Sequence, residues 1–270
     1  MANITVSTDI DALLQSADNA AARDSLGAIN YPYTTDFQSG VAQTRNLTGT
    51  FTNTFPDTAA LSSVYLGSNV TQIGIASFLH CTGLQSVTIP DSVISIASYA
   101  FYDCTSLQSV NIPDSVTSIG IQAFYNCTSL TSVNIPDGIT SIEEGTFSFC
   151  TDLTSINIPD SVTSIGREAF RGCGRLTSVT SFGGTETIDR FAFNNCQDLT
   201  VISLPDSLTS LADYAFRDCI TLATINCLAT TAPTLGTSVF LGVSATTIQV
   251  PVGATGYGTT YGGLTVSYVL

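Results

Sequence analysis

Cysteine is the residue type in this sequence whose spacing could support chemistry. Seven of the eight cysteines follow one another at intervals of 23 residues, at Cys81, Cys104, Cys127, Cys150, Cys173, Cys196 and Cys219. If successive turns of the chain stack, neighbouring thiols come close enough for disulfides. Side chains in one column point the same way into a core, however, and the convergent C-x-x-C spacing of zinc sites is absent. We therefore interpret them as buried free thiols that pack as small hydrophobic groups, and we predict no metal and no cofactor.

Other residues suited to catalysis are few. His80 is the single histidine, lysine is absent, and Glu143 and Glu144 are adjacent in the chain. A glycoside hydrolase needs two carboxylates that face each other across the substrate, and nothing marks these two as such a pair. Aspartates that follow prolines could bind calcium along one edge, although the D-x-D-x-D-G spacing is absent. We predict that the protein is not an enzyme, and calcium at these turns stays an open alternative.

The elements that would position these residues follow from the same interval, at which eight units align from Thr58 onward. Each unit has a leucine, a β-branched residue three positions later, and usually an isoleucine or leucine two positions after that. The leucines are Leu61, Leu84, Leu107, Leu130, Leu153, Leu176, Leu199 and Leu222, and the β-branched residues are Val64, Val87, Val110, Val133, Ile156, Val179, Ile202 and Ile225. The spacing Leu-x-x-Val-x-Ile predicts a short β-strand with one apolar side.

A turn and an aromatic residue complete each unit. Proline cannot donate to a sheet and aspartate favours a turn, so a Pro-Asp pair predicts the end of a strand. The pairs are Pro90-Asp91, Pro113-Asp114, Pro136-Asp137, Pro159-Asp160 and Pro205-Asp206, and the aromatic residues are Phe78, Phe101, Phe124, Phe147, Phe170, Phe193 and Phe216. One unit cannot bury its apolar side alone, so the units must stack, at roughly 4.8 Å per coil. Ser181-Phe182-Gly183-Gly184-Thr185 replaces the usual turn in the unit 173–195 and predicts a local bulge or kink.

These repeats resemble the BspA-type leucine-rich repeat, with units of the form C-x-x-L-x-x-V-x-I-P-x-x-V-x-x-I-x-x-x-A-F over residues 58–253. The resemblance implies a leucine-rich-repeat solenoid of about eight 23-residue coils, made mostly of short parallel β-strands with loops or short helical turns. Residues 248–253 followed by Tyr257 are similar to the segment that finishes such solenoids. We expect a helical attachment or oligomerisation segment over 1–30, an N-terminal cap over 31–57, the solenoid over 58–242 and a C-terminal cap over 243–270. The family implies binding or adhesion at surfaces, without catalytic residues.

The N-terminal segment has a different character. Residues 7–27 are typical of one or two short helices, with Ser7 or Thr8 as a cap and Gly27 as a stop. Residues 12–27 resemble a short element of bacteriophage tail-fibre proteins, and no secretory signal is evident. We expect a virion-borne adhesin, assembled in the host cytoplasm and attached to other virion proteins through this segment. The alternatives are a structural virion protein, such as a decoration or connector, and a bacterial cell-surface or secreted binding protein.

Composition and variable positions indicate the partners. A formal net charge of −14 disfavours nucleic acid and anionic lipid, and no stretch is apolar enough for membrane insertion. The residues just after the closing aromatic change from unit to unit, and they are not needed to build the stack. From these positions we predict the ligand-binding residues Tyr102, Tyr125, Phe149, Arg171, Asn194 and Arg217. We expect the ligand to be a host surface protein or glycan, and the chain to form a homo-oligomer, for which a trimer is one candidate. Solvated loop residues without a ligand are the alternative.

Overall fold

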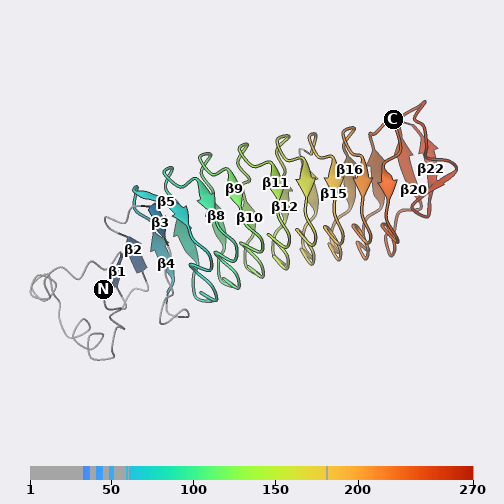
Figure 1. The fold of residues 1–270 in the computed structure, drawn as a ribbon. Coiled ribbons are helices and arrows are strands. Elements are labelled where there is room, and N and C mark those ends of the chain that lie inside the picture. Colours follow the sequence, from blue (N-terminus) through green and yellow to red (C-terminus); the bar gives the residue numbers. More distant parts are fainter. Residues whose placement is uncertain are drawn as a thin grey trace, which may run out of the picture.

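The computed structural model describes residues 33–36, 41–44, 49–51, 59, 61–180 and 182–269. These residues form a parallel β-solenoid of about eight turns of roughly 23 residues, as the repeats predict (Figure 1). The predicted helical segment 1–30 lies outside the described residues, and so does most of the predicted cap over 31–57. The described part contains no helix, and therefore none that could cross a membrane.

One side of the solenoid consists of the predicted Leu-x-x-Val-x-Ile strands. They pair in parallel and in register, so that Val64 lies beside Val87 and Val87 beside Val110. The strands are β4 (Ser63–Tyr65), β6 (Ser86–Thr88), β8 (Ser109–Asn111), β10 (Ser132–Val133), β12 (Ser155–Asn157), β14 (Ser178–Thr180), β16 (Val201–Leu204), β18 (Thr224–Cys227), β20 (Thr247–Val250) and β22 (Leu264–Tyr268). The central residue of a strand points inward and its two neighbours face solvent, as in the buried Val110 of β8.

A second side holds shorter parallel strands, formed where the chain re-enters the core. They are β3 (Gly49–Phe51), β5 (Val70–Ile73), β7 (Ser95–Ile96), β9 (Ser118–Ile119), β11 (Ser141–Ile142), β13 (Ser164–Ile165), β15 (Thr187–Ile188), β17 (Ser210–Leu211) and β19 (Thr234–Leu235). Ile73, Ile96 and Ile119 occupy equivalent, adjacent positions in this ladder. The second apolar step of each unit therefore builds a second wall of the core.

The third side is a run of turns that are hydrogen-bonded both within a coil and between coils. The Phe78 nitrogen donates to the Ala100 oxygen of the next coil at 2.8 Å, and the Cys81 nitrogen donates back to the Phe78 oxygen at 3.1 Å. This alternation requires two left-handed residues per coil, two positions before and two after the aromatic residue. Around Phe101 these are Tyr99 (φ 60°) and Asp103 (φ 58°). We call this side the turn side.

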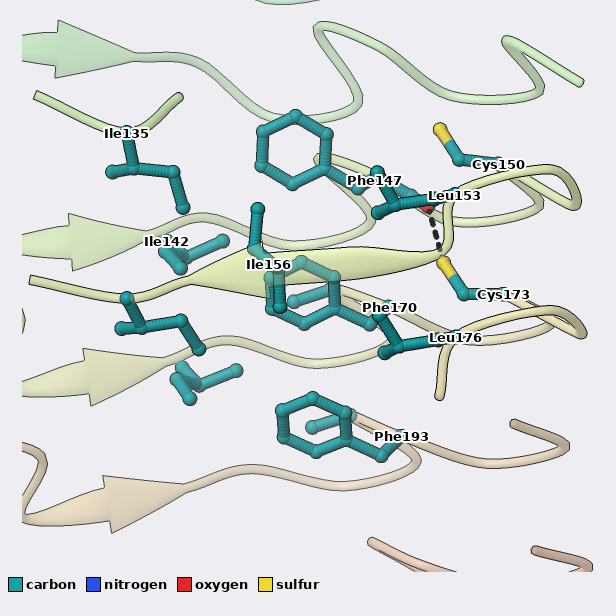
Figure 2. Close-up of a cluster of buried hydrophobic side chains, with 14 of the residues drawn as sticks. Ile135, Ile142, Phe147, Cys150, Leu153, Ile156, Phe170, Cys173, Leu176 and Phe193 are labelled. Atoms are coloured by element: carbon teal, nitrogen blue, oxygen red, sulfur yellow. Dashed lines mark hydrogen bonds between the residues drawn. The ribbon is translucent and has the colours of Figure 1, made fainter. Parts of the chain in front are cut away.

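Stacked phenylalanines fill the interior between the three sides. Centroids of neighbouring rings from Phe78 to Phe240 lie 4.9–5.9 Å apart, and the ring planes deviate from parallel by 3–19°. Figure 2 shows this column at Phe147, Phe170 and Phe193, with Leu153 and Leu176 beside it. Fully burying one phenylalanine side chain contributes roughly 1.5–3 kcal/mol. Stacking of coils thus supplies the apolar layer that a single coil lacks.

The cysteine column lies in this interior. All eight cysteines are buried and free, which confirms the packing interpretation. The Cys173 sulfur donates to the Phe147 oxygen at 3.2 Å (Figure 2), and equivalent bonds recur from Cys104 to Cys219. Each of these six thiols therefore satisfies a main-chain carbonyl of the preceding coil as well as filling space.

The unit 173–195 departs from its neighbours on the strand side. The long-strand ladder is interrupted between β14 and β16, as it also is between β10 and β12, whereas the short strands β13, β15 and β17 pair without interruption. Phe182 is buried and contacts Phe193 edge-on, with 6.3 Å between ring centroids. A Cβ on Gly184 would lie only 1.7 Å from the Asp160 oxygen, so the substituted turn packs directly on the previous coil. Ser181 itself lies outside the described residues.

The two ends of the long-strand side share one feature. At one end, β1 (Tyr33–Asp36) pairs antiparallel with β2 (Val41–Thr44), which pairs in parallel with β4. At the other end, β21 (Thr260–Tyr261) pairs antiparallel with β22. Tyr257 and Tyr261 are buried beneath this end and donate hydrogen bonds to the oxygens of Ala229 and Pro233. Among the described residues, a reversed strand is therefore the outermost strand at both ends of the long-strand side.

Candidate functional site

The turn side carries a continuous row of aromatic and arginine side chains. Its members come from positions two or three residues before and one or two residues after the core phenylalanine of each coil. We call it the ridge, and it comprises His80, Tyr99, Tyr102, Tyr125, Phe149, Arg171, Arg190, Phe191, Tyr214 and Arg217. All ten side chains are exposed or partly exposed to solvent. The two left-handed residues of each coil fix the backbone that presents them.

The tyrosine half of the ridge lies nearest the N-terminal end. Tyr102 and Tyr125 stack with ring centroids 4.7 Å apart and planes 6° from parallel. Tyr99 is 40% exposed, and its ring centroid lies 6.0 Å from that of Tyr102. Partial burial and the neighbouring Asp103 carboxylate raise the pKa of Tyr102, so its hydroxyl stays protonated at neutral pH. The Tyr102 hydroxyl group is therefore a neutral donor and acceptor in this half.

Asp103 organises the polar groups beside the tyrosines. Its carboxylate accepts a hydrogen bond from the Asn126 amide at 2.7 Å, and it lies 3.0 Å from the His80 Nδ1. The His80 ring meets Tyr102 edge-on at 5.8 Å. Histidine, carboxylate and amide are thus fixed together in adjacent coils, at the N-terminal end of the ridge.

The arginine half continues the row, with the Arg171 guanidinium between two rings and Arg190 beside the stacked Phe191 and Tyr214 rings. The Arg171 guanidinium carbon lies 5.6 Å from the Phe149 centroid and 5.8 Å from the Phe191 centroid. Arg190 lies over Phe191 at 5.0 Å and over Tyr214 at 5.6 Å. Cation–π contacts of this kind hold a flat guanidinium group in one orientation. Tyr125 meets Phe149 edge-on at 5.5 Å, and this contact joins the two halves.

Carboxylates balance most of the positive charge here. Arg171 contacts Glu168 at 3.1 Å, Arg217 contacts Asp218 at 3.3 Å, and Arg167 beside the ridge contacts the same Glu168 at 3.1 Å. These pairs are partly exposed, so each contributes about 0–1 kcal/mol to stability. The main effect of these ion pairs is to fix the orientation of the side chains. Hydrogen-bond donors and acceptors therefore alternate along the ridge.

Five of the six predicted binding residues lie on the ridge, namely Tyr102, Tyr125, Phe149, Arg171 and Arg217. Asn194 is apart from them: it is 8% exposed, and its amide donates to the Arg217 oxygen at 2.8 Å. A side chain in this position joins two coils and offers little surface to a ligand. Asn194 therefore connects coils and is not a member of the ridge.

Five members of the ridge are not among the predicted binding residues, namely His80, Tyr99, Arg190, Phe191 and Tyr214. His80 follows the core phenylalanine of its coil, whereas the other four precede it. The available signal was the variability before it, since Ala76, Tyr99, Gln122, Gly145, Glu168, Phe191 and Tyr214 occupy equivalent positions. The left-handed backbone at this position turns its side chain toward the ridge, and the Ala-Phe pattern alone does not predict it.

The cysteines and carboxylates that the sequence suggested as candidates for chemistry make contacts that stabilise the fold. Burial raises the pKa of Cys81 and Cys150 to about 12, which suppresses the reactive thiolate. Glu143 accepts a hydrogen bond from the Ser141 hydroxyl, and Glu144 lies 3.9 Å from Arg167. Among the residues that the structure describes, no three His, Cys, Asp or Glu side chains come together as a metal site. Asp160 of the Pro-Asp turns accepts from the Gly183 nitrogen at 3.1 Å.

Comparison with known proteins places the repeats in a family. The sequence matches the family model described as BspA type leucine rich repeat region over residues 50–177 and 140–260. Among solved structures, a T. pallidum leucine rich repeat protein is 25% identical, with 80% of this chain and 87% of that chain covered and a TM-score of 0.52. No curated protein matches the sequence.

Two further structures are larger than this chain. The pneumococcal vaccine antigen PcpA shares the fold at 21% identity and a TM-score of 0.51, with 76% of this chain and 55% of that chain covered. A leucine rich cell surface protein from Faecalibacterium prausnitzii A2-165 is 25% identical with a TM-score of 0.43, and 77% of this chain and 60% of that chain are covered. This chain thus matches less than two thirds of either protein.

Proposed function

Since the chain belongs to the BspA type leucine rich repeat family, we propose that it is an adhesive binding protein rather than an enzyme, and that the ridge is its recognition surface. The observation that carries this proposal is the continuity of the ridge across coils. Core positions repeat the same residue types from coil to coil, whereas the ridge positions vary and yet contact one another along the row.

The ridge has the properties of a preorganised interface. Each ring or guanidinium group is held by its neighbours, so little side-chain entropy remains to be lost when a ligand binds. Tyrosine and arginine are also the residue types that most often dominate binding energy at interfaces. Partly exposed rings contribute little to the stability of the fold. Their arrangement in a row suits the recognition of an extended ligand.

Binding along such a row depends on many weak contacts. Several copies of the chain, held together through residues 1–30, would multiply these contacts because the second binding event becomes intramolecular. We propose a homo-oligomer for this reason, with a trimer as one candidate. The ligand in this proposal is a protein or glycan on a cell surface.

We propose two possible locations for the adhesin, a bacterial cell surface and a virus particle, and a specific observation favours each. The family implies a role at surfaces and favours a bacterial cell-surface or secreted protein. The likeness of residues 12–27 to phage tail-fibre elements favours a virion appendage assembled in the host cytoplasm. Immunogold microscopy with an antibody to the solenoid separates the two, because the label decorates cell envelopes in the first case and virus particles in the second.

The binding function is tested by changing Tyr102→Ala, Tyr125→Ala and Arg171→Ala together. We expect adsorption of the purified chain to a panel of bacterial and animal cells to fall at least tenfold, a loss of about 1.4 kcal/mol or more. The matched control is Gln85→Ala with Gln108→Ala, two exposed residues beside the long strands. Circular dichroism verifies that both variants fold. Unchanged adsorption of the triple variant, or no adsorption of the wild type, would contradict the proposal.

A further inference from the structure

The charge of the ridge limits the chemistry of its ligand. Arg171 and Arg217 lie against Glu168 and Asp218, and His80 lies against Asp103. Within the part of the chain that the structure describes, Arg190 is the one ridge cation whose side chain has no carboxylate inside 4.0 Å, and it is exposed beside the Phe191 and Tyr214 rings. The whole chain carries −14, so a polyanion would be repelled before it reached these sites. An uncharged ligand meets neither obstacle.

The stacking of the rings decides which atoms a ligand can reach. Tyr102 and Tyr125 cover each other's faces at 4.7 Å, and Phe191 and Tyr214 do the same at 4.9 Å. Because the side chains remain partly exposed, they offer ring edges, and the tyrosines add hydroxyl groups. Arg171 lies between Phe149 and Phe191, so its remaining donors lie in the guanidinium plane. The accessible groups are therefore mostly hydrogen-bond donors and acceptors.

The spacing of these groups suits a linear, repeating molecule. Successive coils advance by roughly 4.8 Å, which is close to the length of one pyranose unit in an extended sugar chain. Asp103 and Glu168 supply acceptors, whereas Asn126 and Arg171 supply donors, so vicinal hydroxyl groups could both donate and accept. Tyrosine and arginine are also enriched at protein interfaces, so a protein partner is the alternative that the tests must separate from a sugar chain.

We infer that the ligand of the ridge is an uncharged polysaccharide that lies along the solenoid axis, with its hydroxyl groups hydrogen-bonded to tyrosine, arginine, asparagine and carboxylate groups of successive coils. This inference rests on the proposed function, because it specifies the ligand of the same surface. No single coil provides a deep pocket in this arrangement, so the affinity increases with the number of sugar units until the ridge is covered.

The first experiment asks which molecule on the cell carries the ligand. Cells that bind the wild-type chain are treated either with periodate, which cleaves vicinal diols, or with protease. We expect periodate to reduce binding at least tenfold and protease to leave it unchanged. Binding that survives periodate and disappears after protease overturns the inference in favour of a protein, and the proposed function still stands.

The second experiment uses soluble competitors. Neutral 1,4-linked oligosaccharides of glucose, mannose and galactose, from two to eight units long, are compared with polygalacturonate. We expect at least one neutral series to compete, with an affinity that rises about tenfold or more from two to six units, and no competition by polygalacturonate. Competition by polygalacturonate alone overturns the inference in favour of an acidic polymer.

The conservative variant Tyr125→Phe separates hydrogen bonding from structure. It keeps the ring that stacks on Tyr102 and removes only the hydroxyl group, so the thermal midpoint should not change. We expect the affinity for the competing neutral oligosaccharide to fall about threefold to tenfold, as for the loss of one hydrogen bond. An unchanged affinity means that the Tyr125 hydroxyl does not contact the ligand, and it overturns the inferred hydrogen bonding of sugar hydroxyl groups to the tyrosines. If the triple alanine variant still adsorbs to cells like the wild type, the proposed function itself fails.

Discussion

Single residues in this solenoid have roles that depend on their column. The cysteines show this most clearly, because seven equally spaced thiols would be typical of a metal or redox site in another arrangement. Here the thiol of Cys173 donates to the Phe147 oxygen, and the column stays buried and free. Desolvation raises the pKa of each thiol from Cys104 to Cys196 in the same way. The cysteine column is therefore a structural element, and the ionisation of its thiols should affect the stability of the fold at alkaline pH.

Alkaline pH should destabilise the protein through these thiols. In the unfolded chain a thiol ionises near pH 8.5, whereas burial raises the pKa of Cys81 and Cys150 to about 12. Above pH 8.5 the unfolded chain releases protons that the folded chain retains, so the free energy of unfolding decreases. The full stability is present below that pH. Each buried thiol lowers it by about 1.4 kcal/mol per pH unit between these values.

Urea midpoints measured under reducing conditions at pH 7, 8, 9 and 10 test this expectation. The midpoint should be constant up to about pH 8 and then decline. In the Cys150→Ala variant, the midpoint should decline less steeply with pH, because one titrating thiol is missing. The cavity left by the substitution lowers the midpoint at every pH. A midpoint that does not change between pH 8 and pH 10 is incompatible with buried, protonated thiols.

At the scale of elements, the distance between coils is set by close backbone contacts. Gly120 follows the short strand β9, and a Cβ there would lie 2.4 Å from the Ser98 nitrogen of the preceding coil. Gly174 lies in a turn where an added Cβ meets no atom within 4 Å. The two glycines form a matched pair, since the same substitution is crowded at one position and free at the other.

Gly120→Ala should lower the free energy of unfolding by about 1–3 kcal/mol, because the coils must shift apart locally. Gly174→Ala should leave it unchanged or raise it by up to about 1 kcal/mol, because alanine restricts the unfolded chain. Urea denaturation of both variants beside the wild type provides the measurement. Equal effects at the two positions would falsify the view that backbone contact fixes the stacking distance.

The elements could be predicted from the sequence to different degrees. The long strands followed from Leu-x-x-Val-x-Ile, because alternation of buried and exposed residues depends only on local geometry. The ridge was predicted in part, since Tyr102 and Arg171 stand at variable positions after the core phenylalanine. Phe191 and Tyr214 were missed because their placement depends on a left-handed residue in each turn, which no residue type in that column reveals. The burial of Asn194 likewise depends on its contact with the next coil.

The whole molecule should tolerate the loss of a complete coil. Deleting residues 105–127, which are 23 residues, joins Cys104 to Thr128 and keeps every column in register. We expect this variant to fold with a similar β-sheet circular dichroism spectrum and a lower thermal midpoint, because one set of coil contacts is lost. The control is deletion of residues 105–115, about half a coil, which leaves one coil too short to contribute to all three sides. That variant should be mostly unfolded, and similar behaviour of the two deletions would refute the stacked-coil description.

The reversed strands at the two ends have a consequence for the protein in solution. Parallel solenoids expose the unpaired backbone groups of their terminal strands, and such edges promote the growth of fibrils by addition of further strands. On the long-strand side, β1 pairs antiparallel with β2 and β21 covers part of β22, so within the described residues neither end of this side presents the parallel edge that a next copy would need. Growth by end-to-end strand addition through this side is therefore disfavoured, even at high local concentration.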